Sequence, residues 1–521
     1  MILELYFNGP IYTMKHDNET VQAVLVDGNR IKAIYQEVPE LKDVKYIDLN
    51  GKAMFPGFVD THIHLVGTGI ALRGVNFKDD DDIEIIIEKI RNATENMDDG
   101  SFLICEGYNE NQLDGYKITK DDIDAITDKK VIIKRVCRHA AIVNSSVFEY
   151  FNINDNVADM PGGHYEKVDG MLNGWVHDNA MEAMLEVASI EDEASLTGHV
   201  EYAVQQFTQA GLTGVHTEDL AYYNDFKDVL NAYQNVINKD NPFRLNILRH
   251  TDVIEDVVQY DFDYNDYFRP DAMKFYADGA LGGRTALFSE PYSDEDTYGL
   301  AIYTSDELAE QVKKARDLDI NIAVHMIGDK AVEMVLDAIE AHPPRSGRDR
   351  LIHVSFLRED LIERMARLNI ICDIQPMFVA SDFPWAIERV GTSRIRYSYP
   401  WKSLLDKGII CGGGSDSPIE DFRPMSGIAA AVNRKAAEDK SDGYNMVEAL
   451  SVFEAISLYT TEAAKVADNI SEYGTIEEGK IADFTILKED PFKVDRLQLH
   501  KVEVAGTVID GKQIYNVENI N

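Results

Sequence analysis

Cysteine is scarce in this 521-residue sequence, and its spacing does not suggest pairing. Cys105, Cys137, Cys372 and Cys411 lie far apart in apolar stretches, and no two of them form a Cys-x-x-Cys motif. A disulfide framework or a cysteine-based zinc site would need closer pairs. The pattern therefore indicates free, buried thiols in a reducing compartment, and we predict a cytoplasmic protein.

Long apolar runs and an excess of basic residues are also missing. No run of 18 apolar residues occurs, and the N-terminus has no basic segment followed by a long apolar core, so neither a membrane span nor a signal peptide is expected. The 91 acidic residues outnumber the 51 basic ones, giving a formal net charge of -40. This charge repels nucleic acids and anionic membranes. The expected partner is a small-molecule substrate, with a homodimer left open.

The sequence does contain a regular alternation of strand-like and helix-like segments. Its length suits a barrel of about 250 residues with appended parts. Eight strand candidates alternate with helix-patterned segments, which predicts an α/β fold with a parallel (β/α)8 barrel of the TIM type. The strand candidates are residues 58–62, 212–217, 244–248, 272–277, 321–325, 351–354, 370–374 and 409–413.

Two further parts are expected around a barrel of residues 54–469. Residues 1–53 and 470–521 contain short strand-like pieces and Asp-Gly hairpin signals, which predict a small composite β-domain of the β-sandwich type. Residues 67–200 would then be an insertion after the first barrel strand. Long insertions on the loop side of a barrel tend to cover the active site, and we expect the same here.

Two histidines stand at alternating positions at the end of the first barrel strand. Residues 55–65 read Phe-Pro-Gly-Phe-Val-Asp-Thr-His-Ile-His-Leu, so a strand would point His62 and His64 to the same side. Two imidazoles on one face can bind one metal ion. In a barrel of this type, reactive groups gather at the carboxyl ends of the strands. The further candidate ligands at such ends are Lys274, His325, His353 and Asp416.

Asp416 is the candidate catalytic residue. It lies in Gly-Gly-Gly-Ser-Asp-Ser-Pro at residues 412–418, where glycines let the backbone approach the site closely. A carboxylate beside a metal can take a proton from metal-bound water, whose pKa falls from 15.7 to about 7. The alternative is an aspartate that caps the following helix.

Lys274 ends an apolar strand, where loss of hydration is expected to lower the pKa of its amine. A neutral amine can take up carbon dioxide, and the resulting carboxylated lysine can bridge two metal ions. The alternative is an ion pair with Asp278 or another carboxylate. We therefore expect one or two divalent ions, with zinc first and manganese, iron or cobalt as alternatives.

The sequence resembles the YtcJ-like, or amidohydrolase-3, branch of the amidohydrolase superfamily, which includes N-substituted formamide deformylase. The resemblance implies a metal-dependent hydrolase of non-peptide C–N bonds. The sequence departs from the usual pattern of this branch at Tyr108-Asn109-Glu110 and at Arg138-His139. Both segments lie in the insertion that is expected to cover the active site, so these differences concern the substrate pocket. The matching motifs are residues 56–64, 107–112, 143–145, 274–279, 325–331, 375–376 and 414–418.

Polar residues outside the ligand set are candidates for substrate binding, each with an ordinary structural role as the alternative. We expect hydrolysis of an N-substituted amide or formamide. The alternative reactions at the same metal site are deamination and hydrolysis of a lactone or ester. The alternative to an enzyme is a non-catalytic scaffold protein. The substrate-binding candidates are Tyr108, Asn109, His139, His216 and Arg284.

Overall fold

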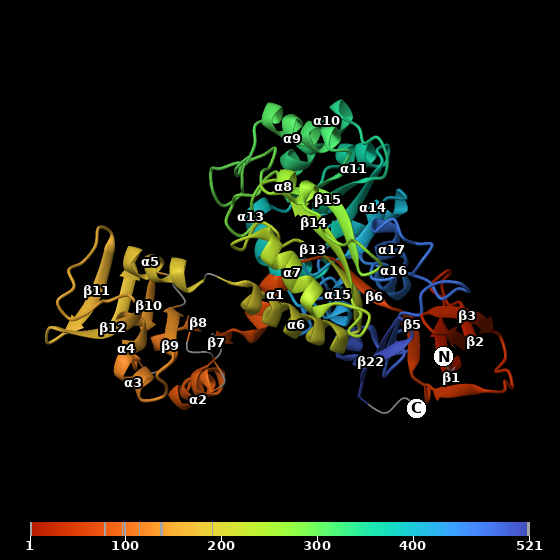
Figure 1. Cartoon of the computed structure of the whole chain (residues 1–521). Coiled ribbons are helices and arrows are strands. Elements are labelled where there is room, and N and C mark those ends of the chain that lie inside the picture. The colour runs from red at the N-terminus through yellow and green to blue at the C-terminus, as the bar shows by residue number, and fades with distance from the viewer. Residues whose placement is uncertain are drawn as a thin grey trace. The chain divides into compact units, whose positions relative to one another are not determined.

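The computed structural model describes residues 3–77, 80–95, 97, 100–113, 115–135, 139–189 and 191–517. The chain divides into two compact units. Unit 1 comprises Met1–Thr68 and Val200–Asn521, and unit 2 comprises Gly69–His199. Figure 1 shows the elements of both units, coloured along the chain. Each unit is described by itself below.

An eight-stranded parallel sheet in unit 1 forms a barrel, and the predicted fold class is confirmed. The sheet runs in the order β6-β13-β14-β15-β16-β17-β18-β19, and β19 returns to contact β6. The eight strands are β6 (Phe58–Ile63), β13 (Leu212–Thr217), β14 (Arg244–His250), β15 (Phe268–Tyr276), β16 (Ile322–Met326), β17 (Asp349–His353), β18 (Ile370–Ile374) and β19 (Ile410–Gly413).

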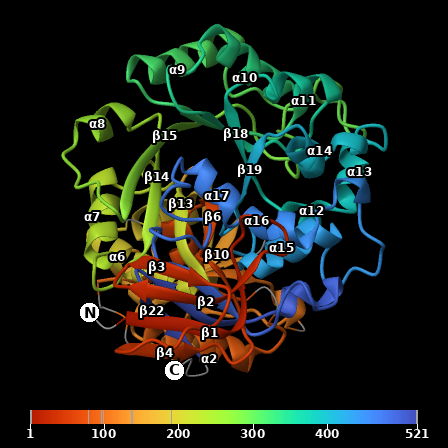
Figure 2. The same cartoon turned by 90° about the vertical axis from the view of Figure 1, so that its right-hand side faces the viewer.

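Helices follow most of these strands and lie around the outside of the barrel (Figure 2). They begin and end at recognisable signals: the first turn of α9, for example, has a capping box between Thr304 and Glu307. The barrel strands themselves are buried on both faces, which explains why they read as continuous apolar runs. The main outer helices are α6 (Glu193–Gln209), α7 (Phe226–Val236), α8 (Ile254–Gln259), α9 (Ser305–Asp317), α10 (Asp329–Ala341), α11 (Glu359–Met365), α14 (Trp401–Asp406) and α15 (Pro424–Asn433).

A second sheet of unit 1 combines strands from both ends of the chain. Its order is β22-β21-β20-β5-β1-β2-β3, with β4 also paired to β1. The short strand β5 is central, because it pairs antiparallel with β20 and parallel with β1, and it leads directly into β6 of the barrel. The strands are β1 (Leu3–Tyr12), β2 (Thr20–Asp27), β3 (Arg30–Tyr35), β4 (Val44–Asp48), β5 (Ala53–Pro56), β20 (Phe484–Leu487), β21 (Val504–Ile509) and β22 (Lys512–Asn516).

Arg244 joins this composite sheet to the barrel. It begins β14, and its guanidinium is bound to Asp483 at 2.7 Å and to Asp510 at 2.6 Å. All three side chains are largely buried. The two Asp-Gly segments at 27–28 and 510–511 lie at hairpin turns of the same sheet. The barrel and the composite sheet therefore form one packed body.

Unit 2 has its own sheet and its own apolar core. The sheet order is β11-β12-β10-β9-β8-β7, and the core includes Ile133, Ile142 and Trp175. Cys105 is a free, buried thiol in this core, as Cys372 and Cys411 are in the barrel, whereas Cys137 and Arg138 lie outside the described residues. The elements are β7 (Val75–Asn76), α2 (Ile83–Thr94), β8 (Phe102–Tyr108), α3 (Lys120–Asp124), β9 (Lys130–Arg135), β10 (Ala140–Val143), α4 (Ser145–Tyr150), β11 (Gly163–Val168), β12 (Met171–Asp178) and α5 (Asn179–Ala188). Across the described ranges of both units, none of the helices combines the length and the apolar character needed to cross a membrane.

Candidate metal centre

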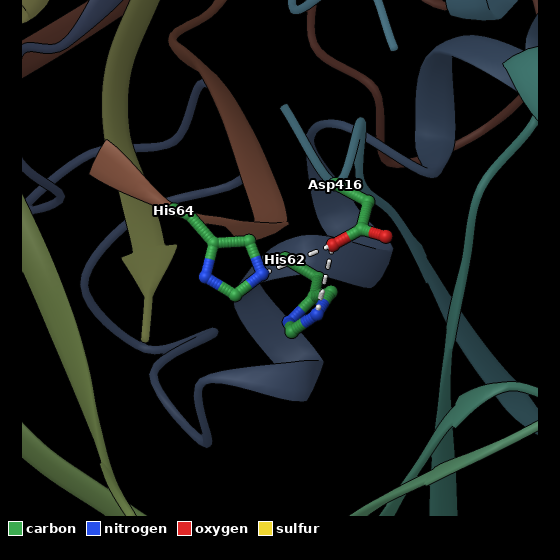
Figure 3. A group of neighbouring side chains, drawn as sticks. All are labelled: His62, His64 and Asp416. Carbon is green, nitrogen blue, oxygen red and sulfur yellow. Dashed lines mark ion pairs between the residues drawn. The ribbon is translucent and has the colours of Figure 1, made fainter. Parts of the chain in front are cut away.

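His62, His64 and Asp416 converge at the carboxyl ends of two neighbouring barrel strands (Figure 3). The histidines belong to the end of β6, and Asp416 follows β19. One ligand atom from each residue lies within 4.8 Å of the other two. The Nε2 atoms of His62 and His64 lie 3.4 and 3.3 Å from the same carboxylate oxygen, Oδ1 of Asp416. The two rings and the carboxylate thus surround a common point, as a metal site requires.

The donor atoms in this group fit a divalent metal ion. His62 is 1% exposed, and within the described part of the chain neither of its ring nitrogens has a hydrogen-bond partner. A buried polar atom left without a partner costs about 1–3 kcal/mol, and a bound cation would remove that cost. Imidazole nitrogens with a carboxylate oxygen are a donor set typical of zinc and related transition metals.

The charge states of the three groups suit metal binding. Burial lowers the pKa of His62, which keeps the ring neutral. Burial alone would raise the pKa of Asp416, but the neighbouring His62 and His64 rings hold it well below its usual value. Burial disfavours the imidazolium of His64, yet the contact with Asp416 outweighs it and raises the pKa to about 9. Metal binding would therefore release a proton from His64.

His325 and His353 lie beside this group at the ends of β16 and β17. The ring centroids of His62 and His353 are 5.6 Å apart, and those of His325 and His353 are 4.5 Å apart. Both rings are neutral, because burial lowers the pKa of His325 to about 4 and holds the pKa of His353 well below its usual value. Four predicted histidines and Asp416 thus come together at one mouth of the barrel.

Hydrogen bonds to three of these rings show which nitrogen of each ring carries a proton. His64 Nδ1 lies 2.7 Å from the carbonyl of Glu218, and His325 Nε2 lies 3.1 Å from the carbonyl of Gly279. His353 Nδ1 lies 2.8 Å from Oε1 of Gln375. Because a carbonyl oxygen can only accept, each of these nitrogens carries the proton. In the neutral rings of His325 and His353 the opposite nitrogen is then a lone-pair donor. His64 Nε2 becomes one when its proton is released, and this is the arrangement of metal-binding histidines.

Lys274 is in the predicted place, but the prediction for its charge is wrong. Burial does oppose the ammonium form, but the carboxylate of Glu218 outweighs it and raises the pKa of Lys274. Its Nζ lies 2.5 Å from Oε2 of Glu218, and both side chains are fully buried. The partner is not Asp278, whose carboxylate accepts backbone N–H groups of Leu287, Ile327 and Gly328. The physical reason is that two buried opposite charges in contact stabilise each other.

Glu218, which follows the second barrel strand, forms an ion pair with Lys274 that the sequence analysis did not predict. It follows β13 and is 0% exposed. Besides Lys274, its carboxylate accepts hydrogen bonds from the hydroxyls of Tyr222 at 2.9 Å and Tyr276 at 3.3 Å. Lys274 keeps the pKa of Glu218 at about 2 despite burial. The available signal was its position directly after the second barrel strand, where reactive groups are expected.

Asp60 links the two chain segments that carry the ligands. Its Oδ1 accepts the backbone N–H of His62, and its Oδ2 accepts that of Ser415, both at 3.0 Å. The side chain is fully buried. Asp60 therefore holds the end of β6 and the segment before Asp416 against each other.

The five substrate-binding candidates have different surroundings. His216 lies on β13, is 1% exposed, and shows no hydrogen-bond partner for either ring nitrogen among the described residues. Arg284 is already ion-paired with Asp294 at 2.9 Å and with Glu295 at 3.1 Å, so its charge is matched within the chain.

The other three candidates belong to unit 2, whereas the ligand groups belong to unit 1. Tyr108 is fully buried in the core of unit 2, and its hydroxyl donates to the carbonyl of Tyr116. Asn109 is half-buried in the turn after β8. His139 is exposed and lies 3.1 Å from Oδ1 of Asp178. Burial makes Tyr108 part of the apolar core of its unit.

Comparisons with known proteins agree along nearly the whole chain. Residues 45–515 match a family described as "Amidohydrolase family". The putative amidohydrolase YtcJ of Bacillus subtilis is 40% identical over 528 residues, covering 98% of this chain and 99% of that protein. The N-substituted formamide deformylase of Arthrobacter pascens is 25% identical over 538 residues, covering 97% of both. The crystal structure of an uncharacterised metal-dependent hydrolase from Pyrococcus furiosus superposes with a TM-score of 0.77 at 28% identity, covering 94% of this chain and 100% of that one.

Proposed function

Because this chain belongs to the amidohydrolase family, we propose that it hydrolyses a carbon–nitrogen bond other than a peptide bond, in an N-substituted amide or formamide. The observation that carries the proposal is the convergence of His62, His64 and Asp416, in which both ring nitrogens of the buried His62 have no hydrogen-bond partner among the described residues. The likeness to N-substituted formamide deformylase supports this type of substrate. The partner of the site is a small molecule.

The metal would be held by the three converging groups together with the neighbouring rings of His325 and His353. When bound, a divalent ion supplies a Lewis acid and lowers the pKa of water from 15.7 to about 7. Asp416 accepts the proton of the attacking water and delivers it to the nitrogen of the leaving amine. Glu218 and Lys274 lie beside these groups as a neutral pair, so they add no net charge to the site.

We infer zinc as the resident ion, because neutral imidazoles and one carboxylate are its usual ligands. The number of ions depends on Lys274. A second ion would call on a carboxylated Lys274 as an additional ligand. Carboxylation requires the amine to leave its ion pair with Glu218 and to lose its proton, so the ion pair favours the unmodified lysine.

The direct test is Asp416→Asn assayed on a panel of N-substituted amides and formamides. Loss of general acid–base catalysis is expected to lower kcat by about 100-fold to 10,000-fold. Asp317→Asn on the exposed face of α9 is the matched control and should leave kcat unchanged. Metal content measured on the same samples separates loss of the ion from loss of the proton acceptor.

Two results would overturn the proposal. The first is full activity of Asp416→Asn, which would remove the proposed proton route. The second is a wild-type protein that binds no divalent metal. Product analysis for formate, amine or ammonia then distinguishes amide hydrolysis from deamination and from cleavage of a lactone or ester.

A further inference from the structure

A buried glutamine contacts one of the metal-centre histidines. Gln375 follows β18 directly, and His353 is the last residue of the neighbouring strand β17. The two side chains are 2% and 3% exposed, and Oε1 of Gln375 lies 2.8 Å from Nδ1 of His353. We infer that Gln375 is a positioning residue that fixes the proton of His353 on Nδ1 and so makes its Nε2 a metal ligand. This inference rests on the proposed function.

The ring of His353 is held from several sides. Phe378 stacks on its face, with centroids 5.5 Å apart and an interplanar angle of 15°. His325 crosses it at 76°. Gln375 is the residue that contacts its Nδ1. The aromatic contacts fix the plane of the ring, but they do not distinguish its two nitrogens, so the glutamine oxygen decides which nitrogen carries the proton.

The alternative orientation of the glutamine amide is incompatible with metal binding. If the amide NH2 faced His353, it would donate to Nδ1, and the proton of the neutral ring would then lie on Nε2. A protonated Nε2 has no lone pair for a metal. In the observed orientation Nε2 of Gln375 has no hydrogen-bond partner among the described residues. Leaving this buried NH2 group unpaired costs free energy, and that penalty accompanies the orientation in which the amide oxygen faces His353.

The backbone at this strand end is also unusual. His353 has a φ of +73°, and the following residue, Val354, has a φ of +41°. This left-handed region is sparsely populated by residues other than glycine, and least by β-branched ones such as valine. Such conformations persist where the surroundings impose them, and they cluster at functional sites. The unusual backbone at the end of β17 therefore sets the position of the His353 ring, and the hydrogen bond with Gln375 sets which of its nitrogens carries the proton.

The test compares Gln375→Leu with Gln375→Glu in the full-length protein. Leucine has a similar volume and no acceptor, whereas glutamate can only accept once ionised and keeps the proton on Nδ1. Metal is removed with a chelator, and the affinity for Zn²⁺ is measured by competition with a colorimetric chelator. His353→Ala removes the whole imidazole and shows what loss of this ligand costs in affinity. His62→Ala tests the group formed by His62, His64 and Asp416. Gln259→Leu, at an exposed position of α8, is the matched control.

We expect Gln375→Leu to weaken Zn²⁺ binding by about 10-fold to 100-fold, the effect typical of removing the partner of a ligating histidine. Gln375→Glu should restore wild-type affinity or exceed it. Circular dichroism and thermal unfolding establish that each variant is folded.

Unchanged affinity in Gln375→Leu would overturn the inference, and so would equal losses in the leucine and glutamate variants. Unchanged affinity in His353→Ala would also overturn it, because His353 would then not bind the ion. These outcomes leave the proposed function standing as long as His62→Ala abolishes binding. Absence of Zn²⁺ binding in the wild type would instead refute the proposed function itself.

Discussion

The ion pair between Lys274 and Glu218 makes a quantitative prediction. Their side chains are 1% and 0% exposed, and the charged atoms are 2.5 Å apart. Removing one partner of a buried pair leaves an uncompensated charge and costs about 3–5 kcal/mol. Glu218→Gln and Lys274→Met should each lower the free energy of unfolding by that amount.

The double variant should be more stable than either single variant. Replacing both charges removes the desolvation cost as well as the attraction, and such replacements are often neutral or stabilising by about 1–4 kcal/mol. The assay is urea unfolding of chelator-treated protein, analysed as a double-mutant cycle. The exposed pair of Lys313 and Glu310 on α9 is the control, and its coupling should stay below about 1 kcal/mol.

The same pair predicts a pH dependence of stability. Lys274 lowers the pKa of Glu218 from 4.5 to about 2, so its contribution to stability is complete above pH 4.5 and is lost as the pH falls toward 2. The pKa of Lys274 is raised above 10.5, so its contribution is complete below pH 10.5 and is lost at higher pH. The double variant should lose both dependences. Additive single losses, within about 0.5 kcal/mol, would refute the coupling.

Three further predictions concern the metal centre and its supports. Chelation should abolish hydrolysis and Zn²⁺ should restore it, as measured by kcat before and after readdition; activity that survives complete metal removal would contradict the proposed chemistry. Asp60→Ala removes the acceptor for two backbone N–H groups and should weaken Zn²⁺ binding by about 10-fold to 100-fold, whereas Asp60→Asn should lose less because it keeps one acceptor oxygen. Equal affinities of all three proteins would contradict this. Arg244→Ala leaves Asp483 and Asp510 without their partner and should lower the free energy of unfolding in urea by about 3–5 kcal/mol. A loss under about 1 kcal/mol would show that this ion pair does not hold the composite sheet to the barrel.

The barrel and most of the candidate ligands were predictable because both depend on patterns local in sequence. Strands buried on two faces read as short apolar runs, and the residue that ends such a run lies at the mouth of the barrel. His62, His325 and His353 each end a run of this kind, so their meeting follows from the fold alone. Asp416 was recognisable from the glycines before it, which let the segment pass close to His62.

What could not be predicted depends on side chains from different strands. Lys274 and Glu218 are 56 residues apart, and their pairing requires the relative height of β13 and β15 in the barrel, which no local pattern encodes. For this reason the sign of the pKa shift of Lys274 was wrong, although its position was right. Gln375 was visible only as part of a Gln-Pro motif. Its contact with His353 depends on how β17 and β18 align.

The short strand β5 has a consequence for how the protein is made. It lies between β1 and β20, and it continues through Gly57 into the strand that carries His62 and His64. During translation, β1 is present early, but β20 leaves the ribosome only when nearly all of the chain has been synthesised. Until then β5 has an open edge, which invites non-native strand pairing. A premature stop just before β20 would yield a polypeptide that contains every candidate metal ligand but lacks the strand that supports two of them.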